Sequence, residues 1–478
     1  MNKYDYIIVG AGPTGLTMAW YLSSRLGKRV LIIDRENSIG GCHRVMRVNN
    51  LFSEHGPRIY LNNFINFMKL LNDMGLDFYT MFTKYKFNVS DIGNKSIQNF
   101  TIRELFVITV FYLKYIVNPE ESRITTMEEF CLKNNFSKEA MDYLDRLCRL
   151  TDGAELSRYT LFTFFELINQ NSLYTTYQPV LPNDVGLFRE IETKLLNTKL
   201  VEILLNTEVV KINEVGGNCK SISVKRHSDT EDLEAERYIM AIPPVALVKI
   251  LEKSTKPVQN LFGNLNDFVA PLSVKSAYLT YIPITFHWNT DIKLEKKWGF
   301  PSTEWGVAYI VLSDYMKFDN PNSKTVISST ITMPDRISSR TGKTPNQSSE
   351  SELRREVLRQ LRISFPNLPE PTVSILAPDI YRSEDGTKWA SSDVPFVFTR
   401  AGYLKKNANG NIYNVGTHSG NSQYAFTSME AAVENGVRLL VEIEPRFKYR
   451  FKKQFTVNKL LMIIVLIILI FITFKNFT

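Results

Sequence analysis

Residues 6–20 read YIIVGAGPTGLTMAW and residues 30–45 read VLIIDRENSIGGCHRV. Apolar runs open both stretches, and between them lies an apolar, glycine-punctuated segment long enough for a helix. The pattern predicts a buried strand over 4–10, a helix over 13–26 and a second strand over 29–34. This strand, helix and strand predict an α/β fold class, with a Rossmann-like, doubly wound domain at the start of the chain.

The glycine spacing in the first stretch predicts a site for the diphosphate of a dinucleotide. Gly10 allows the tight turn, Gly12 lets the backbone approach the diphosphate, and Gly15 lets the helix pack closely on the strand. The diphosphate is expected at the N-terminus of the helix that begins at Pro13. Asp34 ends the second strand, where its carboxylate can accept hydrogen bonds from a ribose and would repel a 2′-phosphate.

The composition limits the remaining possibilities. At 478 residues, with 44% hydrophobic and 12% aromatic residues, the chain has material for two packed domains. The net charge is +8, and part of the excess lies in the short run 446–454, which argues against a nucleic-acid-binding face. The four cysteines are widely spaced, so we expect reduced thiols and no metal site.

The C-terminal region predicts a membrane anchor. Residues 460–474 are apolar and lie between Lys459 and Lys475, so 457–475 is expected to be a transmembrane tail anchor. The basic residues of the linker 446–456 place the larger N-terminal part on the cytosolic side. A core helix is the alternative interpretation. No cleaved secretory leader is expected before the first strand.

Two further segments carry structural predictions. The segment 101–117 is apolar but contains Arg103, Glu104 and Lys114, so it predicts a buried helix, with a helix lying on a membrane surface as the alternative. The segment 334–352 is polar and rich in turn residues, which predicts a mobile surface loop.

The residues after Asp34 distinguish between dinucleotides. Gly40 and Gly41 follow the acid at six and seven residues, and a basic residue, Arg44, comes after Cys42 and a histidine. Here the sequence resembles the flavoprotein superfamily of amine oxidases, phytoene desaturases and protoporphyrinogen oxidases. The resemblance implies FAD as the cofactor, with the glycine pair and the basic residue near its diphosphate.

Later stretches resemble the same superfamily in the same order. They are residues 52–76, 181–196, 203–212, 238–247 and 411–440. The resemblance implies a turn along the flavin at Gly56, a strand that holds adenine near Val209, and a closing helix that begins near Met429 and points N–H groups at the flavin. The full set of expected FAD contacts is Gly10, Gly12, Pro13, Thr14, Gly15, Asp34, Arg35, Gly40, Gly41, Arg44, Gly56, Pro57, Arg58, Val209, Gly416 and Met429.

The resemblance also implies a domain organisation. The FAD-binding domain is expected in three parts, interleaved with an α+β substrate domain that has a helical part and a sheet part. The expected FAD-binding parts are 1–80, 181–250 and 396–445; the substrate parts are 81–180 and 251–395; the linker and the anchor follow at 446–456 and 457–475.

The implied activity is oxidation of a small molecule by hydride transfer to FAD. The residue expected to contact the flavin through a water is Lys275, with a solvated strand lysine as the alternative. The aromatic pair that cages amines in this superfamily is not evident beside Met429, and the predicted anchor favours a lipophilic substrate. The electron acceptor and the oligomeric state are left open.

Two alternative functions fit the N-terminal pattern. An isomerase similar to UDP-galactopyranose mutase would use reduced flavin without net oxidation. A catalytically inactive, FAD-binding membrane scaffold would account for the departures from the superfamily motifs at Cys42 and at Asn183.

Overall fold

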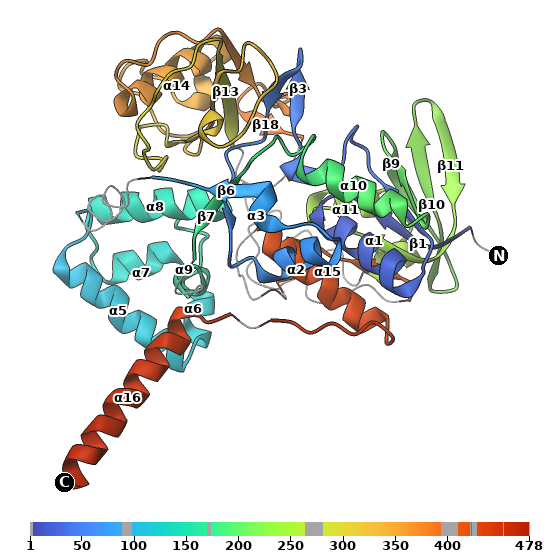
Figure 1. Ribbon diagram of the computed structural model, residues 1–478, viewed down its shortest axis with the longest axis horizontal. Coiled ribbons are helices and arrows are strands. Elements are labelled where there is room, and N and C mark those ends of the chain that lie inside the picture. Colours follow the sequence, from blue (N-terminus) through green and yellow to red (C-terminus); the bar gives the residue numbers. More distant parts are fainter. Residues whose placement is uncertain are drawn as a thin grey trace.

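The structure is a computed structural model that describes residues 3–87, 98–169, 174–262, 281–392, 410–420, 422, 428–452 and 454–477. Its central element is a sheet of five parallel strands in the order β19-β12-β1-β2-β8 (Figure 1). The strand order reverses between β1 and β12, as in other doubly wound folds, so the predicted α/β class is confirmed. The strands are β1 Tyr4–Val9, β2 Val30–Ile33, β8 Val201–Leu204, β12 Ala235–Met240 and β19 Ile412–Asn414.

The two faces of this sheet carry different layers. Alternate side chains of β1 point to opposite faces, so Tyr6 and Ile8 join one core, while Ile7 and Val9 join the other. The first core contains helices, and the second contains a three-stranded antiparallel sheet and two short helices. The first layer comprises α1 Pro13–Leu26, α2 Ile65–Asp73, α10 Leu187–Asn197 and α15 Met429–Ile443. The second comprises β9 Glu208–Val215, β10 Asn218–Arg226, β11 Asp229–Leu233, α11 Pro244–Glu252 and α12 Lys256–Leu261.

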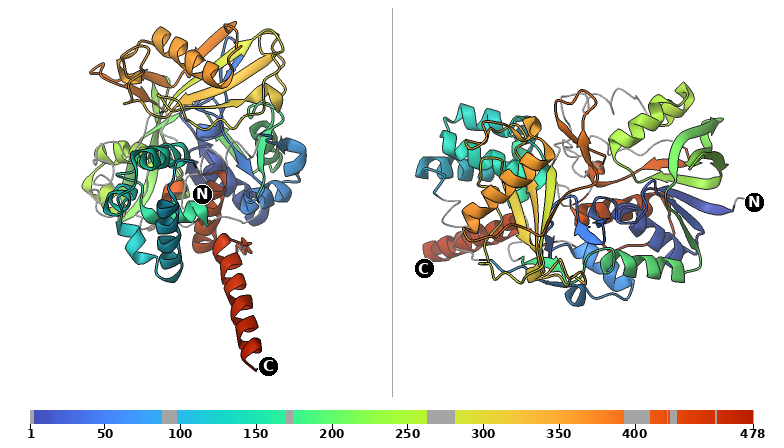
Figure 2. Two further views of the ribbon diagram at one scale, coloured as in Figure 1. Left: turned by 90° about the vertical axis from the view of Figure 1, so that its left-hand side faces the viewer. Right: turned by 90° about the horizontal axis from the view of Figure 1, so that it is seen from above.

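The chain leaves this domain twice. The first excursion forms a group of helices, and the second forms a four-stranded antiparallel sheet, β14-β15-β13-β16, packed against α14 (Figures 1 and 2). The first comprises α5 Ile102–Val117, α6 Glu120–Ile124, α7 Met127–Lys133, α8 Lys138–Asp152 and α9 Leu161–Ile168. The second comprises β13 Ile282–Trp288, β14 Val307–Val311, β15 Thr325–Ile331, α14 Glu350–Ser364 and β16 Val373–Leu376.

Short elements join these parts. A three-stranded sheet, β5-β7-β6, and two strand pairs, β3-β4 and β17-β18, lie between the larger layers. Their bounds are β3 Met46–Val48, β4 Leu51–Ser53, β5 Tyr60–Leu61, α3 Phe78–Met81, β6 Phe82–Lys84, β7 Thr176–Pro179, β17 Ile380–Arg382 and β18 Trp389–Ser391. The described residues also form the 3-10 turns η1 Gly41–His43, η2 Leu312–Asp314, η3 Pro345–Gln347 and η4 Thr417–Ser419.

The helix predicted over 101–117 is present as α5, but it is not buried. Thr101 and Glu104 form a capping box at its N-terminus. Its inner face packs through Tyr112 and Tyr115, which are 7% and 5% exposed. Its outer face exposes four large apolar side chains, at 88%, 67%, 52% and 87%, which are Ile102, Phe106, Leu113 and Val117. The prediction of a buried helix is therefore wrong for that face.

The segment 334–352 is mostly turns with exposed side chains, as predicted for a surface loop, but it ends in a helix and is anchored to the fold. The last part of this segment is the first turn of α14, which Ser349 and Glu352 cap. Ser338 and Ser348 are fully buried, and the Ser338 hydroxyl donates a hydrogen bond of 2.8 Å to Glu356 on α14. A partner eighteen positions away along the chain holds this segment in the fold.

The C-terminal helix α16, Val457–Phe477, projects from the helical group (Figures 1 and 2). Its first turn is docked there, because the Tyr112 hydroxyl donates to Asn458 Oδ1 at 2.6 Å and the Asn458 N–H donates to Asn169 Oδ1 at 3.0 Å. Among the described residues, no helix is both long enough and apolar enough to cross a membrane. The predicted transmembrane anchor is therefore without support.

The packing of α1 against β1 can be tested at the glycines near the start of the chain. A Cβ on Gly15 would collide with the Gly10 carbonyl oxygen and lie 3.2 Å from Ile8, so Gly15→Ala must push α1 away from β1. We expect a loss of about 1–3 kcal/mol in the free energy of unfolding, measured by urea titration without FAD. The control is Gly12→Ala, whose Cβ would meet only Gly41, at 3.8 Å. Equal stabilities of the two variants would contradict the packing argument.

Candidate active site

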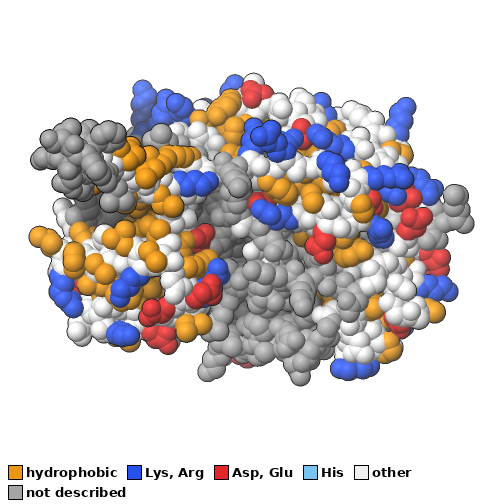
Figure 3. All heavy atoms as spheres, turned by 90° about the horizontal axis from the view of Figure 1, so that it is seen from below, with side chains coloured by type: hydrophobic (Ala, Val, Ile, Leu, Met, Phe, Trp, Pro, Cys, Tyr) orange, Lys and Arg blue, Asp and Glu red, His pale blue; other side chains and the backbone are white. Residues whose placement is uncertain are grey.

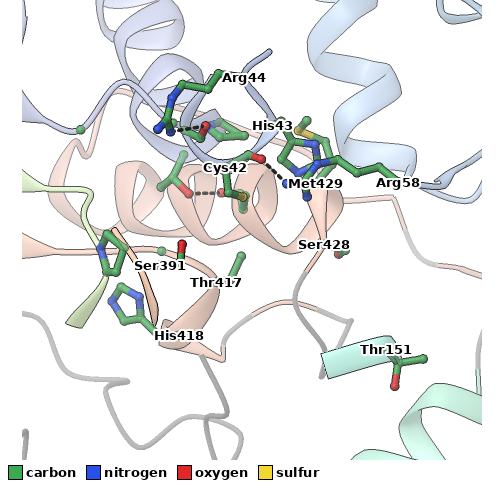
Figure 4. Close-up of a pocket in the computed structure, with 18 of the residues that line it drawn as sticks. Cys42, His43, Arg44, Arg58, Thr151, Ser391, Thr417, His418, Ser428 and Met429 are labelled. Atoms are coloured by element: carbon green, nitrogen blue, oxygen red, sulfur yellow. Dashed lines mark hydrogen bonds between the residues drawn. The ribbon is translucent and has the colours of Figure 1, made fainter. Parts of the chain in front are cut away.

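A large cavity of about 1330 Å³ includes residues at the carboxyl ends of β1 and β2 and the turn after β12, beside the point where the strand order reverses. In open parallel sheets, this is the position at which ligands bind. One end of the cavity lies on Gly12, in the turn between β1 and α1, and on Thr14 in the first turn of α1. The other end reaches Ile108 of α5, Leu147 of α8 and Phe164 of α9. Figure 4 shows Thr151 of α8 well apart from Met429 and the other labelled residues near η1 and α15.

The first end of the cavity presents backbone rather than side chains. Gly12 lines the cavity, and a Cβ built there would meet only Gly41 within 4 Å, so a larger side chain would stand in the cavity itself. Gly12 caps α1 without any side-chain hydrogen bond, and Pro13 begins the helix. The first N–H groups of α1 are therefore available to an anion.

Asp34 is fixed at this end of the cavity by backbone donors. Its Oδ2 accepts the Ala11 N–H at 2.7 Å, and its Oδ1 accepts the Glu36 N–H at 2.9 Å. Burial raises the pKa of Asp34, and these two hydrogen bonds oppose that shift. A carboxylate has about four acceptor positions, so both oxygens can still accept ribose hydroxyls.

Arg44 holds the second glycine pair in place. Its guanidinium donates to the Gly41 carbonyl and to Glu36 Oε2, both at 3.1 Å, and the side chain is 6% exposed. Gly40 has φ +113°, and a Cβ there would press on the ring of Phe188 at 2.7 Å. Since Glu36 balances its charge, Arg44 orders the loop beside the cavity.

The closing motif forms another wall. Ser428 caps α15 by accepting the Ala431 N–H at 3.0 Å, and both Ser428 and Met429 line the cavity (Figure 4). The N-terminus of α15 therefore faces the cavity, and its contact with the flavin stays a prediction. His418 lies in the preceding turn, and burial lowers its pKa to about 4, so its imidazole is neutral at pH 7.

The far end of the cavity is apolar. It is built from the helical group and the four-stranded sheet, which are separated in sequence by more than a hundred residues. Its apolar and aromatic lining residues are Phe100, Ile108, Tyr143, Leu144, Leu147, Leu150, Phe164, Leu167, Ile168, Tyr174, Trp298, Phe300, Tyr309 and Ile310. The carboxylates that line the cavity, among the residues described, are Asp34, Glu36 and Glu208, near the nucleotide-binding elements.

The family model of flavin-containing amine oxidoreductases matches residues 13–439, which is most of the chain. The chain belongs to this family. The superfamily resemblance seen in the sequence is thereby confirmed. A flavin-containing amine oxidoreductase binds FAD, and this protein is an FAD-dependent oxidoreductase.

Solved structures show the same fold. A putrescine oxidase bound to putrescine has 14% sequence identity and a TM-score of 0.62, covering 93% of this chain and 99% of that one. Cyclohexylamine oxidase from Brevibacterium oxydans has 13% identity and a TM-score of 0.59, covering 92% and 98%. At these identities, the similarity concerns the fold.

The match to the alternative isomerase is short. UDP-galactopyranose mutase of Mycoplasma pneumoniae is 36% identical over 62 residues, which are 12% of this chain and 15% of that protein. The chain thus matches only a small part of the length of this curated relative. The isomerase alternative is therefore not favoured.

The site residues fit the cofactor of the family. Gly12 leaves room for a diphosphate, the uncapped N-terminus of α1 offers donors to it, and Asp34 can accept the ribose hydroxyls. Thirteen of the predicted contacts line the cavity: Gly10, Gly12, Pro13, Thr14, Asp34, Arg35, Gly41, Arg44, Pro57, Arg58, Val209, Gly416 and Met429.

The remaining predicted residues have other positions. Gly15 and Gly40 are packed against Gly10 and Phe188, and Gly56 lies against Thr330 of β15. These three shape the walls without lining the cavity. Lys275 lies outside the described residues, and its contact with the flavin stays a prediction.

Sequence reasoning did not predict the apolar end of the cavity or a position for His43 in its lining. The histidine lines the cavity, and its Nδ1 lies 3.2 Å from the Tyr60 hydroxyl. The nearby Arg58 guanidinium donates a short hydrogen bond to the Cys42 carbonyl. The residues of α5, α8 and α9 carry no motif, so only their aromatic content could have suggested a ligand.

The glycine cradle gives a direct test of the cofactor site. Gly12→Val places a branched side chain in the cavity, so we expect the purified variant to lose FAD while keeping its fold. Flavin absorbance and circular dichroism measure the two properties. Ser24→Val is the control, because Ser24 is exposed on the same helix and does not line the cavity. Normal FAD binding by Gly12→Val would contradict this placement of the diphosphate.

Proposed function

We propose that this flavoprotein oxidises a predominantly apolar small molecule by hydride transfer to FAD. The observation that carries the proposal is the apolar end of the cavity, where α5, α8, α9 and the sheet bring aromatic and aliphatic side chains together. FAD supplies the hydride acceptor, and the protein supplies binding, orientation and exclusion of water. The proposal extends the family assignment to a substrate class.

The charges of the cavity support an apolar substrate over a dication. A diamine would need a carboxylate at the far end, since an unpaired ammonium group in an apolar site is costly. Among the described lining residues, the carboxylates belong to the nucleotide-binding elements. Tyr143, Tyr174 and Thr151 add hydroxyl groups to the lining of the cavity.

We further propose that the folded part acts at a bilayer surface. The outer face of α5 exposes Ile102, Phe106, Leu113 and Val117, and α16 exposes apolar side chains over 460–468. Figure 3 shows hydrophobic side chains gathered on one side of this face of the molecule, with Lys and Arg among them. An apolar helix face with flanking basic residues is typical of interfacial helices.

The proposed lipid-facing surface is consistent with an apolar substrate. Ile108 of α5 lines the cavity, so the same helix has one side toward the substrate site and another toward the proposed lipid contact. Apolar substrates concentrate in bilayers. The basic residues of 446–452 favour the anionic cytosolic leaflet, so we propose that the folded part faces the cytosol.

A homologous series of substrates tests the proposed class. For primary n-alkylamines, we expect the apparent Kd to fall about fourfold for each added CH₂, the effect of about 0.8 kcal/mol of apolar burial. Anaerobic loss of flavin absorbance measures binding and reduction together. A diamine of the same length should bind more weakly than the monoamine.

The same measurement separates the alternatives. Equal affinity for the diamine and the monoamine would contradict an apolar far end. If amines fail, a parallel series of cyclic hydrocarbons and polyenes tests an apolar substrate without nitrogen. Bound FAD that no member of either series reduces would favour the inactive scaffold.

The lipid contact predicts a change in vesicle binding. Phe106→Ser with Leu113→Ser removes two exposed apolar groups, so we expect at least a tenfold lower partition coefficient on phosphatidylcholine vesicles containing phosphatidylserine. Flotation measures the bound fraction. The control is Ile363→Ser on α14, whose side chain is 61% exposed, and it should bind as the wild type does. No difference between the variants would contradict the lipid contact at α5.

A further inference from the structure

A second, much smaller cavity lies beside the FAD pocket and shares Arg58 with it. Its volume is about 10 Å³, close to the space that one water molecule needs. Three buried polar atoms among its lining residues have no hydrogen-bond partner in the described part of the chain: Glu54 Oε1, Arg58 Nε and Asn183 Oδ1. Glu54 and Asn183 are 8% and 6% exposed, so bulk water does not readily satisfy them.

The chemistry of these atoms matches one water molecule. Arg58 Nε is a donor, and Asn183 Oδ1 is an acceptor. The Glu54 carboxyl group accepts when ionised and donates when protonated. A water among them would make these three hydrogen bonds and could donate a fourth to the Tyr60 hydroxyl, which also lines the cavity, within the range of two to four for a buried water. It would also remove the cost of three unpaired polar groups.

Hydrogen bonds connect this cavity to the FAD pocket. Tyr60 also lines the small cavity, and its hydroxyl accepts a bond of 3.1 Å from Asn183 Nδ2. The same hydroxyl lies 3.2 Å from His43 Nδ1, and His43 lines the FAD pocket. Since Asn183 donates to Tyr60, the Tyr60 proton is free to point at His43 Nδ1, which places the ring proton on Nε2.

We propose that the small cavity holds one ordered water, and that Glu54, this water, Tyr60 and His43 form a proton-transfer path between a buried carboxyl group and the FAD pocket. The proposal rests on FAD binding, which the family establishes, and does not depend on the substrate class. Asn183 is a positioning residue, because it bonds to Tyr60 and, through its oxygen, to the water.

The transfer conserves every proton. Glu54 gives its proton to the water, the water gives another to Tyr60, and Tyr60 gives one to His43 Nδ1. His43 then releases the proton of Nε2 into the FAD pocket. Glu54 ends as a carboxylate beside Arg58, and the water and Tyr60 end neutral. The reverse sequence returns a proton to Glu54 when the pocket supplies one.

The electrostatics permit this exchange near neutral pH. Burial raises the pKa of Glu54 to about 7, and the Ser328 hydroxyl and the Arg58 charge oppose the shift. Burial and Arg58 lower the pKa of His43 well below its usual value, so its ring stays neutral. Among the described residues that line the small cavity with Glu54, the charged and titratable ones are Arg58 and Tyr60; Gln178 of β7, Asn183, Leu312 and Met316 add no charge.

The midpoint potential of bound FAD tests the exchange. Two-electron reduction to FADH⁻ takes up one proton, so the potential falls by about 30 mV per pH unit. Above pH 7, Glu54 is ionised in the oxidised protein, and the negative charge of FADH⁻ raises its pKa, so reduction takes up a second proton. We expect the slope to double above pH 7 in the wild type, and Glu54→Gln to lose this steeper segment.

A matched carboxyl group provides the control. Burial also raises the pKa of Glu166 on α9 to about 7, but Glu166 lines neither cavity. Glu166→Gln should therefore keep the wild-type curve. A steeper segment that persists in Glu54→Gln, or that is lost in both variants, would overturn the proposal.

The path itself is tested kinetically. Tyr60→Phe keeps Glu54 and its charge but removes the hydroxyl between the water and His43. After a jump from pH 6 to pH 8, the flavin absorbance change that follows Glu54 ionisation should be at least tenfold slower in Tyr60→Phe, with the same final amplitude. Glu54→Gln should lack this change. An unchanged rate in Tyr60→Phe would show that the proton takes another route, and the path would be wrong.

Discussion

The site depends on the close approach of two stretches of backbone, the turn after β1 and the loop at the second glycine pair. A Cβ on Gly41 would lie 3.0 Å from Gly12 Cα, and Gly10 leaves no space before the Ala241 carbonyl. Arg44 and Glu36 hold the loop on the turn, and Asp34 holds the turn through the Ala11 N–H. This contact leaves a wall of bare backbone, which a diphosphate requires.

The sequence predicted correctly those elements whose ends are set by neighbouring residues in the chain. The helix over 13–26 has its predicted bounds, because Pro13 starts it and Gly27 ends it in the left-handed conformation. For the segment 334–352, composition predicted the exposed turns but not the burial of Ser338, whose hydroxyl donates to Glu356, a partner that turn composition does not reveal. Apolar content likewise predicted α5 as a helix, but could not show that its outer face is exposed among the described residues.

The two ends of the cavity differ in how far sequence could predict them. The nucleotide end could be predicted from sequence motifs, because glycines and one acidic residue must occupy fixed positions around a diphosphate and a ribose. The apolar end is assembled from α5, α8, α9 and strands of the second excursion, with no residue type that is required at a fixed spacing. Many side chains can fill such a wall, so its chemistry becomes visible only when the elements are brought together.

Glu54 belongs to neither end of the large cavity, but to the small cavity beside it. It follows β4 by one residue, and His55, the next residue, turns to Asp379, with His55 Nδ1 and Asp379 Oδ2 2.8 Å apart. A carboxyl group, a guanidinium and an amide around one small cavity cost more to bury than aliphatic side chains of the same volume would. The packing of Phe52, Leu312 and Met316 around the same cavity shows that apolar groups fit there. The stability of the fold therefore does not explain why these residues are polar. Their position between the protein interior and the FAD pocket explains it.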